Sequence, residues 1–270
     1  MPSWPGVRRS TRDDEVARTV LVTGGGRGIG LGIVTRFLAE GCNLAVLEKD
    51  LAADPGLAEL AAGAAGRLWT MAGDLNSAAD RQDFVTGALA RFGRLDVLVN
   101  NAGVSPQRRG DLLAVTEDAW DFVLDTNLKA TFFLTQLVAR QMIAQPVIDA
   151  ARGYIVNLGS LNSYAVAVDR AEYCTAKAGL AMLTQLFARR LAAEQIYVHE
   201  VRPGVIDTPM TRVVHDRYDR LIAAGEDFPI ARWGQPADIA LAVSGLVGGC
   251  FRYSTGEVIN VDGGFHLRRQ

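Results

Sequence analysis

Short runs of aliphatic and β-branched residues alternate along most of the chain with longer segments of helical periodicity, and this alternation constrains the fold more than any other feature. The runs carry few polar positions, so the strands that they form are expected to be covered on both faces. Strands joined by helices in this way build right-handed crossover units and a parallel sheet. The sequence therefore predicts an α/β fold, a doubly wound parallel sheet of about seven strands with helices on both faces. Strands are expected at residues 19–23, 43–48, 67–73, 95–100, 154–160, 197–204 and 257–264, and helices near 29–40, 77–92, 117–144, 173–194 and 236–247.

The chain has 270 residues, of which 49% are hydrophobic, and this is enough for one large core. Residues 19–270 are expected to form a single catalytic domain. Residues 1–18 mix charges and lack an apolar stretch, so we expect a flexible tail rather than a secretory signal. Region 205–232 has the weakest pattern and is a candidate substrate lid at the carboxyl ends of the strands.

The charge of the chain indicates which partners to expect, and its cysteine content indicates the cellular compartment. The net charge is −2 and the basic residues are spread along the chain, so neither nucleic acid nor a membrane surface is an expected partner. Three widely spaced cysteines are typical of a reducing compartment and favour a cytoplasmic protein. No metal is expected, because metal-ligand spacing is absent from the three histidines, His199, His215 and His266. A small molecule is the expected partner.

A glycine-rich segment, TGGGRGIG at residues 23–30, lies between the first predicted strand and the first predicted helix. Glycines there permit a sharp turn and a close approach to a pyrophosphate, whose charge then lies at the amino end of the helix. This position in the chain predicts a Rossmann-type dinucleotide-binding turn. Its candidate contacts are Gly24, Arg27, Gly28, Ile29 and Gly30.

Glu48 ends the second predicted strand, where an acidic side chain can accept hydrogen bonds from the adenosine ribose. The 2′-phosphate of NADP would meet this carboxylate at a cost of roughly 4 kcal/mol per unit charge, for a separation of about 4 Å and an effective dielectric of about 20. Glu48 therefore favours NAD. NADP stays possible, because Arg27 in the turn and Lys49 next to Glu48 could contact that phosphate.

In several further motifs the sequence resembles the short-chain dehydrogenase/reductase family, and the resemblance runs from Thr19 to Gly264. The resemblance rests on the order and spacing of the motifs, in particular a serine thirteen residues before a Tyr-x-x-x-Lys pair. The matching residues are TGGGRGIG at 23–30, Asp74 in GDL, NNAG at 100–103, Asn127 in TNL, Ser160 in NLGS, Tyr173 and Lys177, RPG at 202–204 with Thr208, and YSTGEVINVDGG at 253–264.

Tyr173 and Lys177 lie four residues apart, so they share one face if the segment is helical. Hydride transfer between a carbinol carbon and nicotinamide requires a group that moves a proton to or from the oxygen. A phenol ordinarily ionises only near pH 10, and a lysine one helical turn away favours the phenolate. Ser160 can hold the substrate oxygen in place. The alternative is that the pair belongs to an exposed amphipathic edge.

The resemblance implies further roles. Lys177 would also bind the nicotinamide ribose, and Asn127 would hold a water that completes a proton relay. For Asn101 a structural role, holding neighbouring strands together, is an equal alternative. The other implied cofactor contacts are Asp74, Leu75, Ala102, Gly103, Pro203, Gly204, Val205, Ile206 and Thr208. The resemblance also implies a homodimer or homotetramer.

The sequence therefore predicts an NAD(P)-dependent oxidoreductase that interconverts a secondary alcohol and a ketone. A sugar, polyol or sugar acid with NAD is the first choice, because fatty-acid reductases of the family typically use NADPH and Glu48 disfavours it. A 3-oxoacyl-thioester reductase is the alternative. A non-catalytic, dinucleotide-binding redox sensor is an alternative of another class. Residues 107–109 (QRR) either attract an anionic substrate or are a solvated charge run.

Overall fold

Seven parallel strands form the centre of the computed structural model, which describes residues 17–148, 151–225 and 228–267. Their order across the sheet is β3-β2-β1-β4-β5-β6-β7. This confirms the predicted Rossmann-type sheet. The strands are β1 (Thr19–Thr23), β2 (Asn43–Glu48), β3 (Leu68–Ala72), β4 (Val97–Asn100), β5 (Gly153–Leu158), β6 (Ile196–Pro203) and β7 (Val258–Val261).

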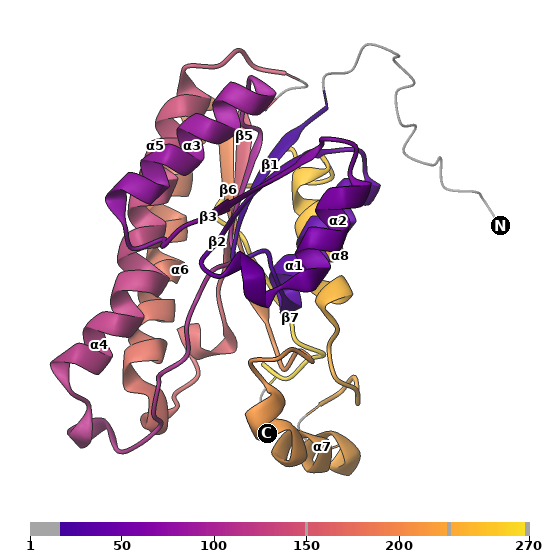
Figure 1. Ribbon diagram of the computed structural model, residues 1–270. Coiled ribbons are helices and arrows are strands. Elements are labelled where there is room, and N and C mark those ends of the chain that lie inside the picture. Colours follow the sequence, from indigo (N-terminus) through magenta and orange to yellow (C-terminus); the bar gives the residue numbers. More distant parts are fainter. Residues whose placement is uncertain (1–16, 149–150, 226–227, 268–270) are drawn as a thin grey trace.

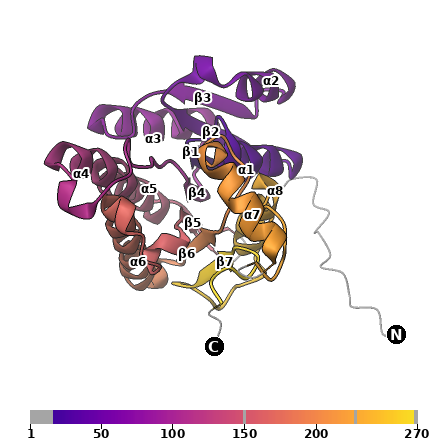
Figure 2. The ribbon, with the colours of Figure 1, turned by 90° about the horizontal axis from the view of Figure 1, so that it is seen from below.

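Helices cover both faces of the sheet, as Figures 1 and 2 show. One layer contains α1 (Gly28–Ala39), α2 (Pro55–Gly63) and α8 (Pro236–Val247). The other contains α3 (Ala78–Phe92), α4 (Glu117–Leu124), α5 (Thr131–Ile143) and α6 (Ala171–Leu191). Within the described residues, no helix is long and apolar enough to cross a membrane.

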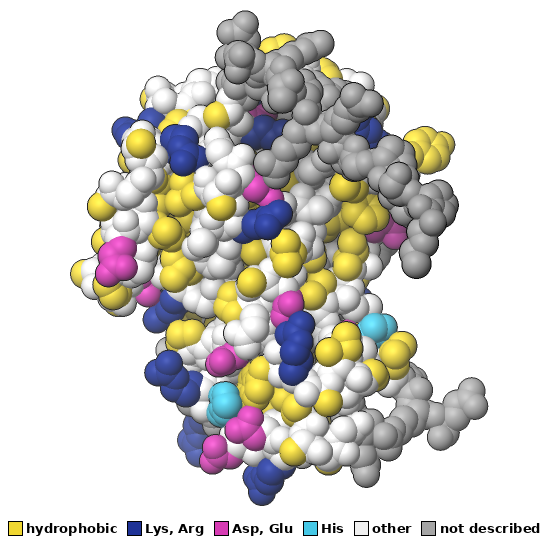
Figure 3. Space-filling model, turned by 90° about the vertical axis from the view of Figure 1, so that its right-hand side faces the viewer, with side chains coloured by type: hydrophobic (Ala, Val, Ile, Leu, Met, Phe, Trp, Pro, Cys, Tyr) yellow, Lys and Arg dark blue, Asp and Glu magenta, His cyan; other side chains and the backbone are white. Residues whose placement is uncertain are grey.

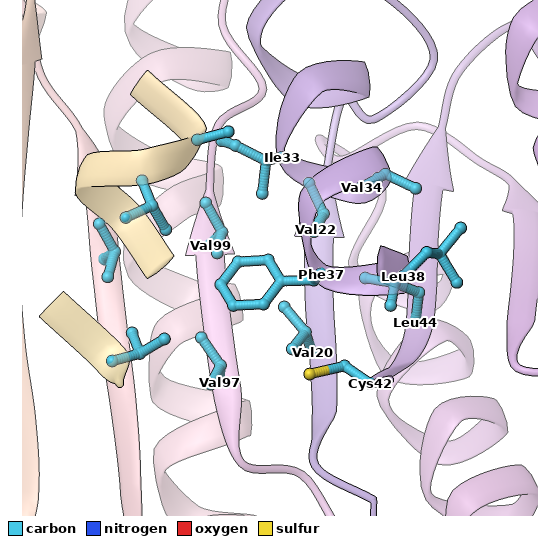
Figure 4. Packing of buried hydrophobic residues seen from close by; sticks show 14 of the residues in the cluster. Val20, Val22, Ile33, Val34, Phe37, Leu38, Cys42, Leu44, Val97 and Val99 are labelled. Atoms are coloured by element: carbon cyan, nitrogen blue, oxygen red, sulfur yellow. The ribbon is translucent and has the colours of Figure 1, made fainter. Parts of the chain in front are cut away.

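Alternate residues of each central strand enter two separate cores, because successive side chains of a strand point to opposite faces. Val20 and Val22 pack with Phe37 of α1, as Figure 4 shows, whereas Leu21 packs on the side of α3 and α5. Both sets are fully or almost fully buried. The strands are therefore apolar on both faces, as their sequence indicated.

Three helical features differ from the sequence-based expectation, and the third, a helix within the candidate lid, is described below. The predicted helix 117–144 is interrupted by a π-helical segment, Asp125–Ala130, between α4 and α5. Helix α2 was not expected, because its Ala/Gly-rich sequence has low helical amphipathicity; only Leu57 is buried.

The candidate lid contains the helix α7 (His215–Ala224), which follows a short 3₁₀ turn at Arg212–Val214. Figure 1 shows α7 below α1, beyond one end of the sheet. Residues 226–227 of the candidate lid, and residues 1–16 of the predicted tail, lie outside the described residues.

Candidate active site

A cleft of about 570 Å³ opens at the carboxyl ends of the strands. Strand β1 lies between β2 and β4 in the sheet, so the strand order reverses at β1. Open α/β sheets bind their ligands at such a switch point, and the cleft lies there. Every site residue predicted from the sequence except Asn127 lines this one cleft. They are Gly24, Arg27, Gly28, Ile29, Gly30, Glu48, Asp74, Leu75, Asn101, Ala102, Gly103, Ser160, Tyr173, Lys177, Pro203, Gly204, Val205, Ile206 and Thr208.

The glycine-rich turn has a backbone that larger residues would strain. Gly24 has φ +66° and Gly28 has φ +52°, both in the left-handed region. A Cβ on Gly30 would overlap the carbonyl oxygen of Gly24. Helix α1 begins at Gly28 and directs its amino end into the cleft wall, so unpaired backbone N–H groups face the place where a pyrophosphate would bind. The turn therefore fits a dinucleotide.

The carboxylate of Glu48 is fixed at the edge of this turn. Its Oε2 accepts a hydrogen bond from the Gly26 N–H at 2.9 Å, and its Oε1 accepts one from the Lys49 N–H at 3.0 Å. The Lys49 ammonium is engaged elsewhere, because it donates to Asp74 Oδ2 at 2.6 Å. That hydrogen bond holds the pKa of Asp74 below its ordinary value. The negative charge of Glu48 is thus left without a cationic partner within the described residues.

Asn101 ties the first strand to the fourth. Its Nδ2 donates to the carbonyl oxygens of Thr23 at 3.0 Å and Gly24 at 2.7 Å. The Thr23 hydroxyl in turn accepts a hydrogen bond from the Ala102 N–H at 3.0 Å. These contacts give Asn101 the structural role that was one of its two expected roles, and they leave it on the cleft wall.

Tyr173, Lys177 and Ser160 line the same cleft as the glycine-rich turn. Lys177 is only 5% exposed, its Nζ donates to the Leu158 carbonyl oxygen at 2.6 Å, and it lies 5.7 Å from the centre of the Tyr173 ring. Ser160 follows β5, and its Oγ accepts a hydrogen bond from the Asn162 N–H at 3.1 Å. A fixed cation, a phenol and a hydroxyl therefore line one cleft, and these are the groups that a proton transfer to or from an alcohol oxygen would use.

Asn127 lies behind the cleft wall, within the π-helical segment. Its amide makes two hydrogen bonds with Val104, accepting from the N–H at 2.8 Å and donating to the carbonyl oxygen at 2.9 Å. A Cβ on Gly103 would lie 3.2 Å from Asn127 Oδ1 and 3.8 Å from Lys177 Nζ, so both side chains lie next to Gly103. The π-helical turn directs Asn127 toward this position.

The sequence predicted that residues 104–111, 161–170 and 205–232 would line the substrate pocket, and among the further lining residues two stand out for their aromatic contacts. The guanidinium carbon of Arg170 lies 4.0 Å from the centre of the Tyr173 ring. Phe265, near the end of the described chain, also lines the cleft and stacks on Phe228 with ring centres 4.4 Å apart. For Arg170 a signal existed, since it stands three residues before Tyr173, about one helical turn.

Comparison with known proteins agrees with this geometry. A family model described as enoyl-(acyl carrier protein) reductase matches residues 24–266. The chain is 35% identical over 258 residues to the 3-oxoacyl-[acyl-carrier-protein] reductase FabG of Staphylococcus aureus, covering 94% of this chain and 100% of that protein. The chain belongs to the short-chain dehydrogenase/reductase family. It is therefore an NAD(P)-dependent oxidoreductase that acts on CH–OH groups and ketones.

Two solved structures of this family show the same fold. A 3-oxoacyl-[acyl-carrier protein] reductase from Brucella melitensis in complex with NAD is 39% identical, with a TM-score of 0.89 and coverage of 95% of this chain and 100% of that chain. A protein from Agrobacterium tumefaciens with bound NADP, described as a 2-deoxy-d-gluconate 3-dehydrogenase, is 34% identical, with a TM-score of 0.80 and coverage of 93% and 97%. Members of the family thus bind either dinucleotide.

Proposed function

We propose that the protein is a ketoreductase that interconverts a 3-oxoacyl thioester and its 3-hydroxy form, with Tyr173 as the proton donor and acceptor. The observation that best supports the reaction is that Tyr173, Lys177 and Ser160 line the same cleft as the glycine-rich turn, with Lys177 Nζ 5.7 Å from the centre of the Tyr173 ring. The similarity to proteins described as 3-oxoacyl-[acyl-carrier-protein] reductases supports the thioester. The first expectation, a sugar, polyol or sugar acid, has weaker support and ranks behind the thioester.

In this mechanism a bound nicotinamide dinucleotide supplies or accepts the hydride at the substrate carbon. Ser160 hydrogen-bonds the substrate oxygen and holds it beside Tyr173. In the direction of reduction, the Tyr173 hydroxyl gives its proton to that oxygen as the hydride reaches the carbon. Lys177, fixed by the Leu158 carbonyl, keeps a positive charge beside the phenolate that forms. Oxidation of the alcohol reverses both transfers.

We also propose NAD as the preferred cofactor. Glu48 is held against the glycine-rich turn by the Gly26 N–H, and this fixed negative charge supports repulsion of a 2′-phosphate. Lys49 is paired with Asp74, which reduces its attraction for such a phosphate. Arg27 is exposed on the turn and is the remaining cation there that supports NADP.

A sugar acid or related hydroxy acid is the second candidate substrate. One observation favours it, namely the arginine stacked on Tyr173 at the substrate end of the cleft. The similarity to a protein described as a 2-deoxy-d-gluconate 3-dehydrogenase supports the same class.

The test is a spectrophotometric assay of nicotinamide oxidation and reduction. Acetoacetyl thioesters of carrier protein and of N-acetylcysteamine would be compared with oxo acids, sugars and polyols, each with NAD and NADP forms in parallel. We expect turnover of the thioesters with NADH. Activity confined to sugars or polyols would contradict the substrate proposal, and a clear preference for NADPH would contradict the role of Glu48.

A further inference from the structure

Arg170 brings into the cleft a positive charge that no acidic side chain neutralises among the described residues. The neighbouring Asp169 forms an ion pair with Arg109 at 3.6 Å and not with Arg170. Glu172 does not pair with Arg170 either, because its Oε2 is buried without a hydrogen-bond partner. The Nε of Arg170 is likewise buried without a hydrogen-bond partner. A buried unpaired donor is unfavourable, so its presence here requires an explanation.

The stacking on Tyr173 fixes the guanidinium without using its hydrogen-bonding capacity. A guanidinium that lies on an aromatic face keeps its fork of N–H donors free in its own plane. The two terminal nitrogens of Arg170 are not sealed from solvent as Nε is, and nothing in the described part of the chain accepts a hydrogen bond from them. The fork is therefore available to an acceptor that enters the cleft.

The position of Arg170 separates it from the cofactor. Lys177 lies one helical turn after Tyr173, near Gly103 and Leu158, whereas Arg170 precedes the helix as its N-cap residue, three positions before Tyr173. The Arg109–Asp169 pair joins the loops that border Arg170, and neither loop belongs to the dinucleotide turn. Arg170 thus faces the substrate end of the cleft.

We infer that Arg170 binds a carboxylate of the substrate, close to the oxygen that exchanges a proton with Tyr173. A planar fork of two N–H donors matches a carboxylate, and the other nearby arginine is already paired with Asp169. The substrate class is then a hydroxy acid and the corresponding oxo acid. This inference rests on the alcohol–ketone reaction proposed above and concerns its second candidate substrate, which would replace the thioester as the first candidate if acid binding depends on Arg170.

The test measures binding without turnover. The protein is saturated with NADH and titrated in a calorimeter with two hydroxy acids, 3-hydroxybutyrate and gluconate. Their uncharged counterparts, methyl 3-hydroxybutyrate and glucitol, are titrated in the same way. Alcohols cannot be reduced by NADH, so only binding is observed. We expect at least one acid to bind tenfold or more tightly than its uncharged counterpart, on the order expected for a charge-assisted bidentate contact.

Variants assign the effect to the guanidinium. Arg170→Met keeps much of the side-chain length and removes the charge, so acid affinity should fall about 10- to 100-fold while the uncharged compounds change less than about threefold. Arg170→Lys keeps the charge but loses the fork, and should be intermediate. Arg189→Met, at an exposed position of the same helix, is the matched control and should leave acid affinity unchanged.

The possible results separate the two proposals. If neither acid binds the wild type more tightly than its uncharged counterpart, or if Arg170→Met weakens both kinds of compound alike, the carboxylate site is refuted. Turnover of a thioester together with that result leaves the proposed reaction intact. Acid binding that depends on Arg170, without any turnover of acids or thioesters, supports the site and refutes the reaction. If Arg170→Met binds NADH poorly or unfolds at a lower temperature than the wild type, the acid affinities of Arg170→Lys and the wild type are compared instead.

Discussion

At the scale of single residues, fixed charges determine the chemistry of the cleft. Lys177 is immobilised by a backbone carbonyl, Arg170 by an aromatic ring and Glu48 by a backbone N–H. Each charge therefore acts from one place and needs little reorganisation when a ligand binds. The contact of Lys177 with the Leu158 carbonyl was not predictable from the sequence, because it depends on where α6 lies relative to the end of β5.

Glu48→Gln should weaken the preference for NAD over NADP. The amide oxygen can still accept from the Gly26 N–H, so the turn is retained while the repulsion of a 2′-phosphate is lost. We expect the ratio of kcat/KM values for the two cofactors to move toward NADP by about tenfold or more. Glu59→Gln, exposed on α2, is the control and should leave the ratio unchanged. An unchanged ratio in Glu48→Gln would contradict the assignment.

Cys42 should make stability depend on pH in the alkaline range. Burial, with a smaller effect of Glu40, raises the pKa of this thiol from 9.0 to about 11. The folded state therefore keeps a proton that the unfolded chain loses, so the contribution is complete below about pH 9 and is lost as pH rises toward 11. Relative to Cys42→Ala, the free energy of unfolding of the wild type should fall by about 1.4 kcal/mol per pH unit in this window. A pH-independent difference in urea unfolding would show that the thiol titrates normally.

At the scale of elements, most strands and helices were predictable because their apolar patterns are long. Helix α8 has the expected bounds, and each strand agrees within a few residues. The π-helical segment was not predictable, since residues 117–144 contain no proline or glycine that would mark an interruption of the helix. Helix α7 was missed because its sequence is charged and none of its described residues is buried.

The π-helical segment gives a prediction for Asn127. Asn127→Ala leaves the N–H and carbonyl of Val104 without their side-chain partners, so it should lower the free energy of unfolding by about 1–3 kcal/mol. Turnover should also fall, because the wall between Asn127 and Lys177 loses its support. Asn76→Ala removes an exposed hydrogen bond to Thr126 and should cost less than about 0.5 kcal/mol. Equal effects of the two substitutions in urea unfolding would contradict a special role for Asn127.

At the scale of the whole molecule, the surface is mixed in charge but has exposed apolar side chains on its helical layers. Figure 3 shows basic and acidic side chains interspersed on the face that it presents. On the layer of α3 to α6, Phe133, Met182 and Leu186 are 41%, 53% and 56% exposed. Apolar side chains grouped on helices in this way are typical of an interface between subunits.

The oligomeric state follows as a prediction. Light scattering should give the mass of a homodimer or homotetramer for the wild type, and Leu186→Asp should shift it toward monomer by placing a charge in the interface. Leu113→Asp, at a position 88% exposed outside these helices, is the control and should leave the mass unchanged. A wild type that is monomeric at micromolar concentrations would contradict this expectation.

The role of Tyr173 as the proton donor is tested by the rate of NADH oxidation by Tyr173→Phe, on whichever substrate the wild type turns over. The substitution keeps the ring on which Arg170 stacks and removes only the hydroxyl. We predict a loss of rate on the order of 10²- to 10⁴-fold, with NADH affinity retained. A Tyr173→Phe variant that reduces the substrate at the wild-type rate would show that the Tyr173 hydroxyl does not transfer the proton. Tight NADH binding with every measured activity unchanged by this substitution would instead indicate a redox sensor.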